Sequence, residues 1–547
     1  MSEEQTLLLR KDFAPVSSAE WEQCLRDAMK GGEISRLYWK TDEEITVKPF
    51  YRAEDLKELS QFEGAGGART GNEWRIRQAI AVADPQQANA AARDAIAGGA
   101  EAICFEAVPE SGGLRGVAVQ SAEDMRALIA GLPRATPQQT QPRRLPGAPC
   151  VPLSFRARQA ARPMLLLYLS QLKQPAEATG SVDFDPLGDL LLEGGSNQPA
   201  DELFADTARV LRFAAVKAPE MRTLAVRGCQ ISEAGGTVVQ ELAFALACGV
   251  EYLSALGEQG LSTDEVCARI FFVFSTGCNY FFEIAKLRAF RLLWAQAVEQ
   301  FKPKRSESLE PVVESVTSRW SMSIYDDYNN LLRGATGAMS AAIGGCDAIE
   351  ITPFDAACQP PDDFSRRLAR NTQIILKNEA GLDRVADPAA GSYYIETLTA
   401  SLAREAWKLF QQVESEGGCL KAIQSGFVQR EVNAARKRKD EAIAIRRRVL
   451  LGTNQYAIAN EQALDKVKLD RDGNLTPLRL SGIKPASTPA ELAEQFASGL
   501  TLGDCLTTPA SAATALVGDP GASTPASATT ALVGGPGARQ ASGKAGF

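Results

Sequence analysis

The sequence predicts an α/β protein: a (β/α)8 TIM barrel with an N-terminal extension and a C-terminal helical linker. The first observation is that short apolar segments alternate with longer segments of helical period over residues 75–410. The second is the size of this region, roughly 330 residues, which fits eight βα units with insertions. Because repeated βα units favour a parallel sheet, a closed barrel is the fold class that we expect.

Individual elements of this barrel can be assigned from local patterns. Helices are expected at 238–246 and 281–297, where apolar residues recur every three or four positions. Strands are expected where apolar residues form short runs bounded by polar ones. These runs are 102–105, 164–168, 224–226 and 348–351.

The regions that flank the barrel differ from it in composition. Residues 1–55 mix polar and aromatic stretches without any βα alternation, and we interpret them as an N-terminal arm. The barrel is then assigned to 56–410, and 411–507 follow as a linker with a helical portion.

The last 40 or so residues contain a repeat of low complexity. Residues 508–523 recur as 524–539 with 13 of 16 positions identical, and both copies consist largely of Ala, Gly, Pro, Ser and Thr. Burial of these few large apolar groups cannot offset the conformational entropy that an ordered chain loses. We therefore predict that 508–547 are a disordered tail. A shifted reading frame or a truncation product is an alternative origin of this tail.

The composition excludes several classes of chemistry. The chain of 547 residues contains no histidine, so histidine-based catalytic triads, imidazole zinc ligands and an axial imidazole on a cobalt are excluded for this chain. A net charge of −8 argues against a nucleic-acid partner, and no apolar run reaches the length of a membrane span. Eleven cysteines without a CxxC pair are typical of reduced thiols in a cytoplasmic protein with no metal site.

Several segments keep a common order along the chain. Each alone would be weak evidence, but together they span about residues 70–456. They are Trp74 to Gln78, Gly180 to Gly188, Gln230 to Gly235, Asn279 to Arg288, Trp320-Ser321, Tyr328 to Asn330, Arg370 to Leu376, Asp387 to Glu396 and Gly452 to Tyr456. In these segments the chain resembles the coenzyme-B12-dependent acyl-CoA mutases, and specifically the small, non-catalytic (beta) subunit of methylmalonyl-CoA mutase.

The resemblance implies a function for the complex rather than for the isolated chain. In that family an acyl-CoA thioester enters along the barrel axis, and adenosylcobalamin on a flavodoxin-like domain caps the barrel and starts a radical rearrangement. The cobalamin signature Asp-X-His-X-X-Gly is absent here, so the resemblance implies that the flavodoxin-like domain is missing. The implied partner is a homologous catalytic large subunit, which would form a heterodimer with this chain and bind both the cofactor and the acyl-CoA substrate.

The chain departs from the family's catalytic pattern at five positions. Cys229 and Gln230 stand where active subunits carry Tyr-His, and Gln230 can donate a hydrogen bond but cannot carry a proton. Glu314 and Glu350 fall where the family has Arg-Thr-His and His-Thr-Asn motifs, and Arg69 falls in its aromatic-rich segment.

These substitutions predict that no residue of this chain is catalytic. New carboxylates would repel an anionic thioester, and Arg319 would obstruct the channel, so we expect a closed pocket. Two alternatives stay open: an active acyl-CoA mutase barrel that uses a separate cobalamin-binding protein, and a truncated product without function.

The segments that the chain retains are better explained by packing than by catalysis. Asp387 before Pro388 is typical of a turn, here expected to lead through Tyr394 into a strand. Glu283 and Lys286 have the spacing of an ion pair on a helix. The amide of Asn330 is suited to buried backbone groups.

Overall fold

The computed structural model describes most of the chain, and all structural statements refer to that part. The described residues are 16–30, 33–57, 69, 71–110, 113–133, 151–193 and 199–458. The predicted tail at 508–547 and the second half of the predicted linker lie outside them.

Eight parallel strand positions close into a barrel, as predicted. In order round the barrel they are β3 (Arg75–Ile80), β4 (Ala102–Glu110), β6 (Leu153–Arg156), β7 (Gly180–Val182), β8 (Met221–Arg222) continued by β9 (Leu224–Val226), β10 (Ile270–Thr276), β11 (Val313–Thr317) and β12 (Ala348–Glu350). The barrel closes where β12 pairs with β3. The fifth position is split at Thr223, so that β8 pairs with β7 while β9 pairs with β10.

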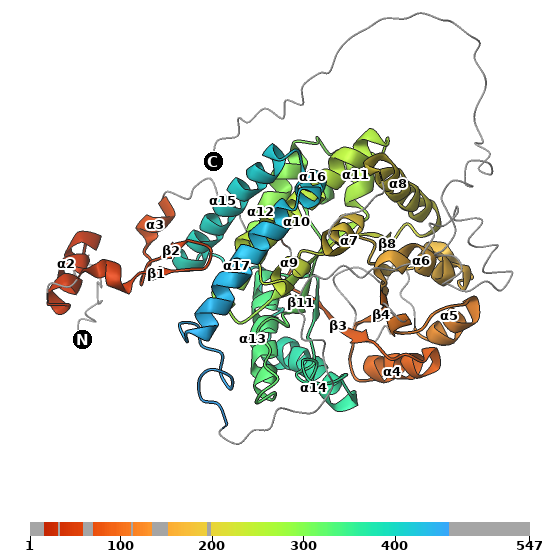
Figure 1. Cartoon of the computed structure of the whole chain (residues 1–547), viewed down its shortest axis with the longest axis horizontal. Helices are drawn as coiled ribbons and strands as arrows, with labels where there is room; N and C mark the ends of the chain where they lie inside the picture. Colours follow the sequence, from red (N-terminus) through yellow and green to blue (C-terminus); the bar gives the residue numbers. More distant parts are fainter. Residues whose placement is uncertain are drawn as a thin grey trace, which may run out of the picture.

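Helices surround the barrel (Figure 1). Those that follow the strands in turn are α4 (Pro85–Ala97), α5 (Ala122–Ile129), α6 (Ala161–Ser170), α7 (Pro186–Glu193), α8 (Ala200–Lys217), α9 (Cys229–Glu233), α10 (Val238–Glu258), α11 (Thr263–Cys267), α12 (Tyr280–Glu299), α13 (Asn329–Gly344) and α14 (Asp363–Ile374). Three more, α15 (Tyr393–Ser415), α16 (Cys419–Gln424) and α17 (Phe427–Ala444), complete the chain of helices, and α15 packs against α10 and α12. The apolar core therefore lies between the outer face of the sheet and this helical layer.

The N-terminal region extends away from the barrel in Figure 1. It consists of α2 (Ser18–Ala28), the antiparallel pair β1 (Trp39–Lys40) and β2 (Thr46–Val47), and α3 (Ala53–Lys57). A complete capping box at Ser17 explains why α2 begins there. Its aromatic side chains include Trp39, which packs with its ring 5.4 Å from Phe282 of the barrel layer.

Two elements differ from the sequence predictions. The predicted strand at 164–168 is wrong, because these residues belong to α6, which is buried on nearly all sides. A short, wholly apolar run carries no period that separates a buried helix from a strand. The expected strand after Asp387 is also wrong: the turn leads into α15, whose first turn is capped by Ser392.

Helix α10 combines the length and apolar composition of a membrane-spanning segment with the surroundings of a core helix. Of its most apolar 18-residue window, 67% is buried inside the fold. It packs against α12 and α15. The apolar character of α10 is therefore explained by burial in the helical layer.

Candidate functional site: the charged interior of the barrel

The inside of the barrel divides into an apolar part and a charged part. Alternation along the strands directs Ala225, Phe271 and Val273 away from the helical layer, and they form an apolar cluster with Val312 and Val316. The charged side chains come from β12, β3, β4 and β6, together with Glu314 of β11. An eight-stranded barrel has a narrow interior, and both groups of side chains project into it.

Arg77 joins the two carboxylates that the sequence marked as departures. The strand register places Arg77 directly opposite Glu350, and its Nε lies 3.2 Å from Glu350 Oε2. Its Nη1 also forms an ion pair with Glu314 on the next strand. Glu314 and Glu350 are therefore brought together and neutralised by an arginine within the barrel.

Arg156 extends this arrangement to the far side of the interior. It stands opposite Glu106 in the β4–β6 register and forms an ion pair with it. Its Nη2 also lies 3.0 Å from Glu350 Oε2, and its Nε 4.0 Å from Asp183 Oδ2. Glu350 is thus held between two guanidinium groups. We call Arg77, Arg156, Glu106, Glu314 and Glu350 the axial ion-pair network.

The electrostatics of this network favour full ionisation of Glu350. Burial alone would raise the pKa of Glu350, but the charges of Arg156 and Arg77 outweigh it and hold that pKa below its ordinary value. A carboxylate that repels an anionic substrate in isolation is here already matched by two cations. The carboxylates of the network are accordingly paired with cations rather than free.

A second group of charged side chains lies next to the axial ion-pair network, at the carboxyl ends of β7 and β9. Arg227 Nη2 lies 2.5 Å from Asp189 Oδ1, and its Nε lies 3.4 Å from Asp185 Oδ2. Asp185 Oδ1 accepts a hydrogen bond of 2.9 Å from Tyr252 Oη. Burial raises the pKa of Asp185, although Arg227 opposes this shift.

Cys229 and Gln230 lie beside this second group, at the start of α9. The Gln230 amide accepts a hydrogen bond from Arg227 Nε and donates one to the Gly188 carbonyl, each at 3.2 Å, when it is oriented to satisfy both partners. Burial raises the pKa of the Cys229 thiol to about 12, so it is neutral at pH 7. Neither side chain therefore gains or loses a proton near pH 7.

Arg69 is not part of this site. It precedes β3 at the opposite end of the barrel, where its Nη2 donates a hydrogen bond of 2.6 Å to Asn72 Oδ1. Its guanidinium occupies the space that a Cβ at Gly345 would need, and Gly345 has a φ of +88° as it ends α13. The structure therefore brings four of the five marked positions toward the barrel interior and separates Arg69 from them.

Arg319 also lies outside the axis. It is exposed on the loop after β11, and its Nη2 donates a hydrogen bond of 3.1 Å to the Ala356 carbonyl. The obstruction of the channel by Arg319 stays a prediction, whereas the arginines of the axial ion-pair network come from β3 and β6. Sequence reasoning missed Arg77 and Arg156, although Arg77 belongs to the retained segment Trp74 to Gln78 and alternates with its apolar residues.

Helix α17 packs against loops at the carboxyl ends of the strands. Lys439 Nζ donates a hydrogen bond of 2.6 Å to the Gly236 carbonyl, and the charged groups of Lys439 and Arg436 each lie 5.9 Å from the Trp320 ring. Gly236 follows α9 and Trp320 follows β11. These loops are where barrel proteins assemble their active sites, and here a helix of the same chain covers part of them.

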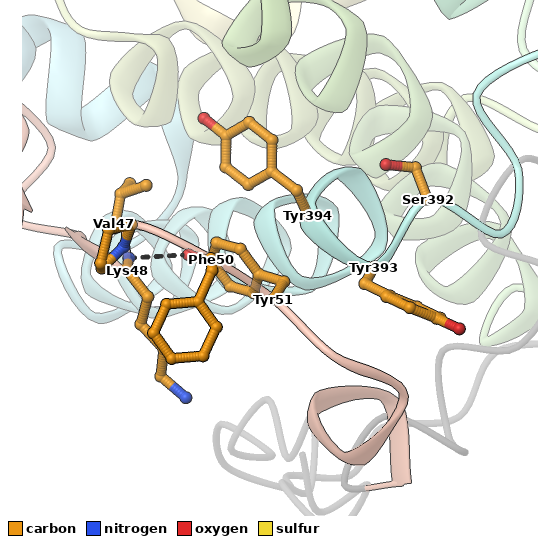
Figure 2. A pocket seen from close by; sticks show the side chains of 8 residues that line it. Val47, Lys48, Phe50, Tyr51, Ser392, Tyr393 and Tyr394 are labelled. Atoms are coloured by element: carbon orange, nitrogen blue, oxygen red, sulfur yellow. Dashed lines mark hydrogen bonds between the residues drawn. The ribbon is translucent and has the colours of Figure 1, made fainter. Parts of the chain in front are cut away.

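A cavity of about 360 Å³ lies outside the barrel, between β2 and the start of α15 (Figure 2). Figure 2 shows the Tyr51 and Tyr394 rings facing each other, with centroids 5.2 Å apart. Burial raises the pKa of Tyr394 to about 12, so its phenol is neutral. The cavity joins the N-terminal region to the barrel and brings together none of the five marked positions.

The retained segments form the ion pair on a helix and the hydrogen bonds to buried backbone groups that the sequence predicted. Lys286 lies 2.6 Å from Glu283 and 2.7 Å from Glu241 of α10. Asn330 donates hydrogen bonds of 2.9 Å to the carbonyls of Ser323 and Phe354. No group of three or more acidic or cysteine side chains that could hold a metal occurs in the described part of the chain.

Together these observations define a (β/α)8-barrel protein whose inner strand faces carry an ion-pair network and whose helices are joined by buried ion pairs. The sequence comparisons place it more closely: the chain belongs to the methylmalonyl-CoA mutase family, whose model matches residues 40–477. It is 37% identical over 479 residues to the methylmalonyl-CoA mutase small subunit of Porphyromonas gingivalis, a match that covers 84% of this chain and 73% of that one.

Two longer relatives complete the comparison. The chain is 33% identical over 463 residues to the methylmalonyl-CoA mutase of Rhizobium meliloti, covering 79% of this chain and 63% of that protein. It is 31% identical over 476 residues to the large subunit from P. gingivalis, covering 81% and 65%. The chain therefore spans less than two thirds of the length of these two relatives.

Proposed function

We propose that the chain is the small subunit of a heterodimeric, adenosylcobalamin-dependent methylmalonyl-CoA mutase, which interconverts methylmalonyl-CoA and succinyl-CoA. In this proposal the chain is not catalytic and stabilises a homologous large subunit that holds the cofactor and the acyl-CoA. The similarity to a relative named as a small subunit supports this assignment. The complex would act in propionate metabolism in the cytoplasm.

The single observation that carries the non-catalytic role is the axial ion-pair network. A thioester chain threaded along the axis would have to displace Arg77, Arg156 and their carboxylate partners. Removing one member of a buried ion pair leaves the other uncompensated, at a cost of about 3–5 kcal/mol. Binding of the substrate would have to offset this cost before any contact with the reacting atoms contributed.

The residues near the carboxyl ends of the strands also do not fit a cobalamin that is ligated by the protein. The sequence provides no imidazole, and the Cys229 thiol is buried and neutral. Lys439 and Arg436 of α17 already pack over Trp320 at the same end of the barrel. We therefore assign cofactor binding to the partner subunit.

The deciding experiment measures adenosylcobalamin-dependent conversion of methylmalonyl-CoA to succinyl-CoA by the purified chain alone and by the chain co-expressed with a catalytic homologue. We expect turnover only in the co-purified pair, and no binding of methylmalonyl-CoA to the isolated chain by calorimetry. Turnover by the isolated chain with free cofactor would contradict the proposal. Activity restored by a separate small cobalamin-binding protein would instead support the alternative of an active barrel.

The stabilising role has its own control. The catalytic homologue is purified with and without this chain, and its thermal unfolding midpoint and yield are compared. We expect both to rise in the pair, because an obligate interface adds buried apolar surface to each partner. Equal midpoints and yields would remove the stabilising role even if the two chains bind each other.

A further inference from the structure

Two cysteines far apart in the sequence meet where α16 packs on α10. The Sγ atoms of Cys248 and Cys419 lie 3.0 Å apart, across a sequence separation of 171 residues. A disulfide requires a separation of about 2.05 Å, so closure needs a relative movement of roughly 1 Å. We propose that Cys248 and Cys419 are a modification site, a thiol pair that a hydroperoxide oxidises to an intramolecular disulfide tying α16 to α10.

The local backbone allows the closure. Gly417 and Gly418, immediately before Cys419, have φ values of +98° and +99°. Both conformations are readily available to glycine, so the start of α16 can adjust without strain from a side chain. The Cys419 N–H donates a hydrogen bond of 3.0 Å to Glu251 Oε2 of α10, which holds the Cys419 end of α16 close to the helix that carries Cys248.

The two thiols differ in solvent exposure, and this difference determines which of them the oxidant reaches first. Cys419 is 1% exposed, whereas Cys248 is only partly buried. The hydrogen bond that the Cys419 thiol shares with Cys248, together with burial, raises the pKa of the Cys419 thiol. The oxidant therefore reaches Cys248 first, and Cys419 acts as the resolving thiol, more rapidly at higher pH because the thiolate is the nucleophile.

The chemistry balances with a hydroperoxide as the named oxidant. Cys248 Sγ attacks one oxygen of ROOH, the O–O bond breaks, and ROH leaves with the thiol proton, giving a sulfenic acid on Cys248. Cys419 Sγ then attacks Cys248 Sγ, the S–O bond breaks, and water leaves with the second thiol proton. Two thiols thus lose two electrons and two protons, while ROOH is reduced to ROH and water.

The bond would fix a segment that reaches the loops at the barrel end. Helix α16 leads through Gly426 into α17, whose Lys439 contacts the Gly236 carbonyl. A crosslink that closes so long a loop restricts the unfolded chain and so favours the folded one. The inference concerns this chain alone and does not depend on its role as a mutase subunit.

The test treats the purified full-length chain with a small excess of hydrogen peroxide and maps peptides without reduction. We expect a peptide pair that joins Cys248 to Cys419 with the mass of both peptides less two hydrogens, a loss of two free thiols per chain, and reversal by dithiothreitol. The thermal unfolding midpoint should rise on oxidation and return on reduction. Sulfinic acid on Cys248 without a crosslink, or crosslinks to other cysteines in equal yield, would overturn the proposal.

Variants separate this pair from the remaining thiols. Cys248→Ala and Cys419→Ala should each abolish the crosslink and the shift in the unfolding midpoint. Cys278→Ala, which removes an exposed thiol, should keep both. If a variant at the buried position fails to fold, the peptide map of the unaltered chain still decides, because it reads the bond directly.

Discussion

Two buried sets of ion pairs in this molecule have opposite relations to the family pattern. In the helical layer, Lys286 is fully buried between Glu241 and Glu283, and both Glu283 and Lys286 lie in a segment that the chain shares with the acyl-CoA mutases. In the axial ion-pair network, Glu314 and Glu350 stand where the sequence predicts a departure from those mutases. The shared charges join helix to helix, whereas the altered charges join strand to strand across the axis.

The two sets of ion pairs therefore lie in different parts of the molecule: one in the helical layer and one inside the barrel. Lys286 Nζ also donates to the Ser275 carbonyl, so it links α10, α12 and β10 at one point. The axial network instead spreads from β11 through β12, β3 and β4 to β6, with several carboxylates sharing two guanidinium groups. The helical set thus fixes the packing of the outer layer, whereas the axial network links the inner faces of five strands.

The largest effect is expected from breaking the helical set. Lys286→Met removes the only cation that contacts Glu241 and Glu283 among the ion pairs of the described chain, and should lower the free energy of unfolding by about 4 kcal/mol. Urea unfolding followed by circular dichroism measures this change. The matched control is Lys408→Met, whose pair with Glu405 is exposed and should contribute under about 1 kcal/mol. Equal losses in the two variants would contradict the assignment.

The axial network should respond less strongly to one substitution, because its cations have several partners. Glu350→Gln keeps the volume but leaves Arg77 with Glu314 and Arg156 with Glu106, so we expect a loss of about 3 kcal/mol at pH 7. The same urea experiment applies. A loss as large as that of Lys286→Met would mean that the network behaves as one unit.

The pH dependence sharpens this comparison. Because the folded pKa of Glu350 lies below its ordinary value of 4.5, the carboxylate stabilises the fold above that value and loses its contribution as the pH falls through the folded pKa. The difference in unfolding free energy between the wild-type chain and Glu350→Gln should therefore be constant near pH 7 and shrink below about pH 4.5. A constant difference down to pH 3 would contradict the lowered pKa.

A further prediction concerns the retained turn at Asp387. Arg288 reaches both Asp387 and Glu396, at 3.0 Å and 2.8 Å, and fastens α12 to the start of α15. Arg288→Lys keeps the charge but cannot bridge two carboxylates with a planar fork, so a loss of about 2 kcal/mol is expected. Hydrogen exchange of the first turns of α15 should rise in this variant and stay unchanged in Lys408→Met.

How much of this could be predicted from the sequence depends on the range of each interaction. The alternation of segments predicted the barrel, and the strands at 102–105, 224–226 and 348–351 are confirmed within one residue or as parts of longer strands. The pair Glu283–Lys286 and the role of Asn330 are confirmed as well, because local spacing and amide chemistry decide them.

The axial network could not be predicted in the same way. Arg77 and Glu350 are neighbours only through the closure of β12 on β3, a contact between residues 273 positions apart. Their sequence neighbours identify each as a strand residue but give neither its register nor its partner. The sequence therefore predicted that Glu314 and Glu350 would alter the axis, whereas the way they do so depends on arginines that only the closed barrel brings to them.

The smallest effect is expected where α17 contacts the end of the barrel. Lys439 donates a hydrogen bond to the Gly236 carbonyl and lies over the Trp320 ring, and each contact of this kind contributes about 1 kcal/mol or less. Lys439→Met should cost about 1 kcal/mol, and should increase hydrogen exchange in α17 but not in α10. If exchange rises in both helices, α17 unfolds together with the core, and its cover over the loops after β9 and β11 is as stable as the helical layer.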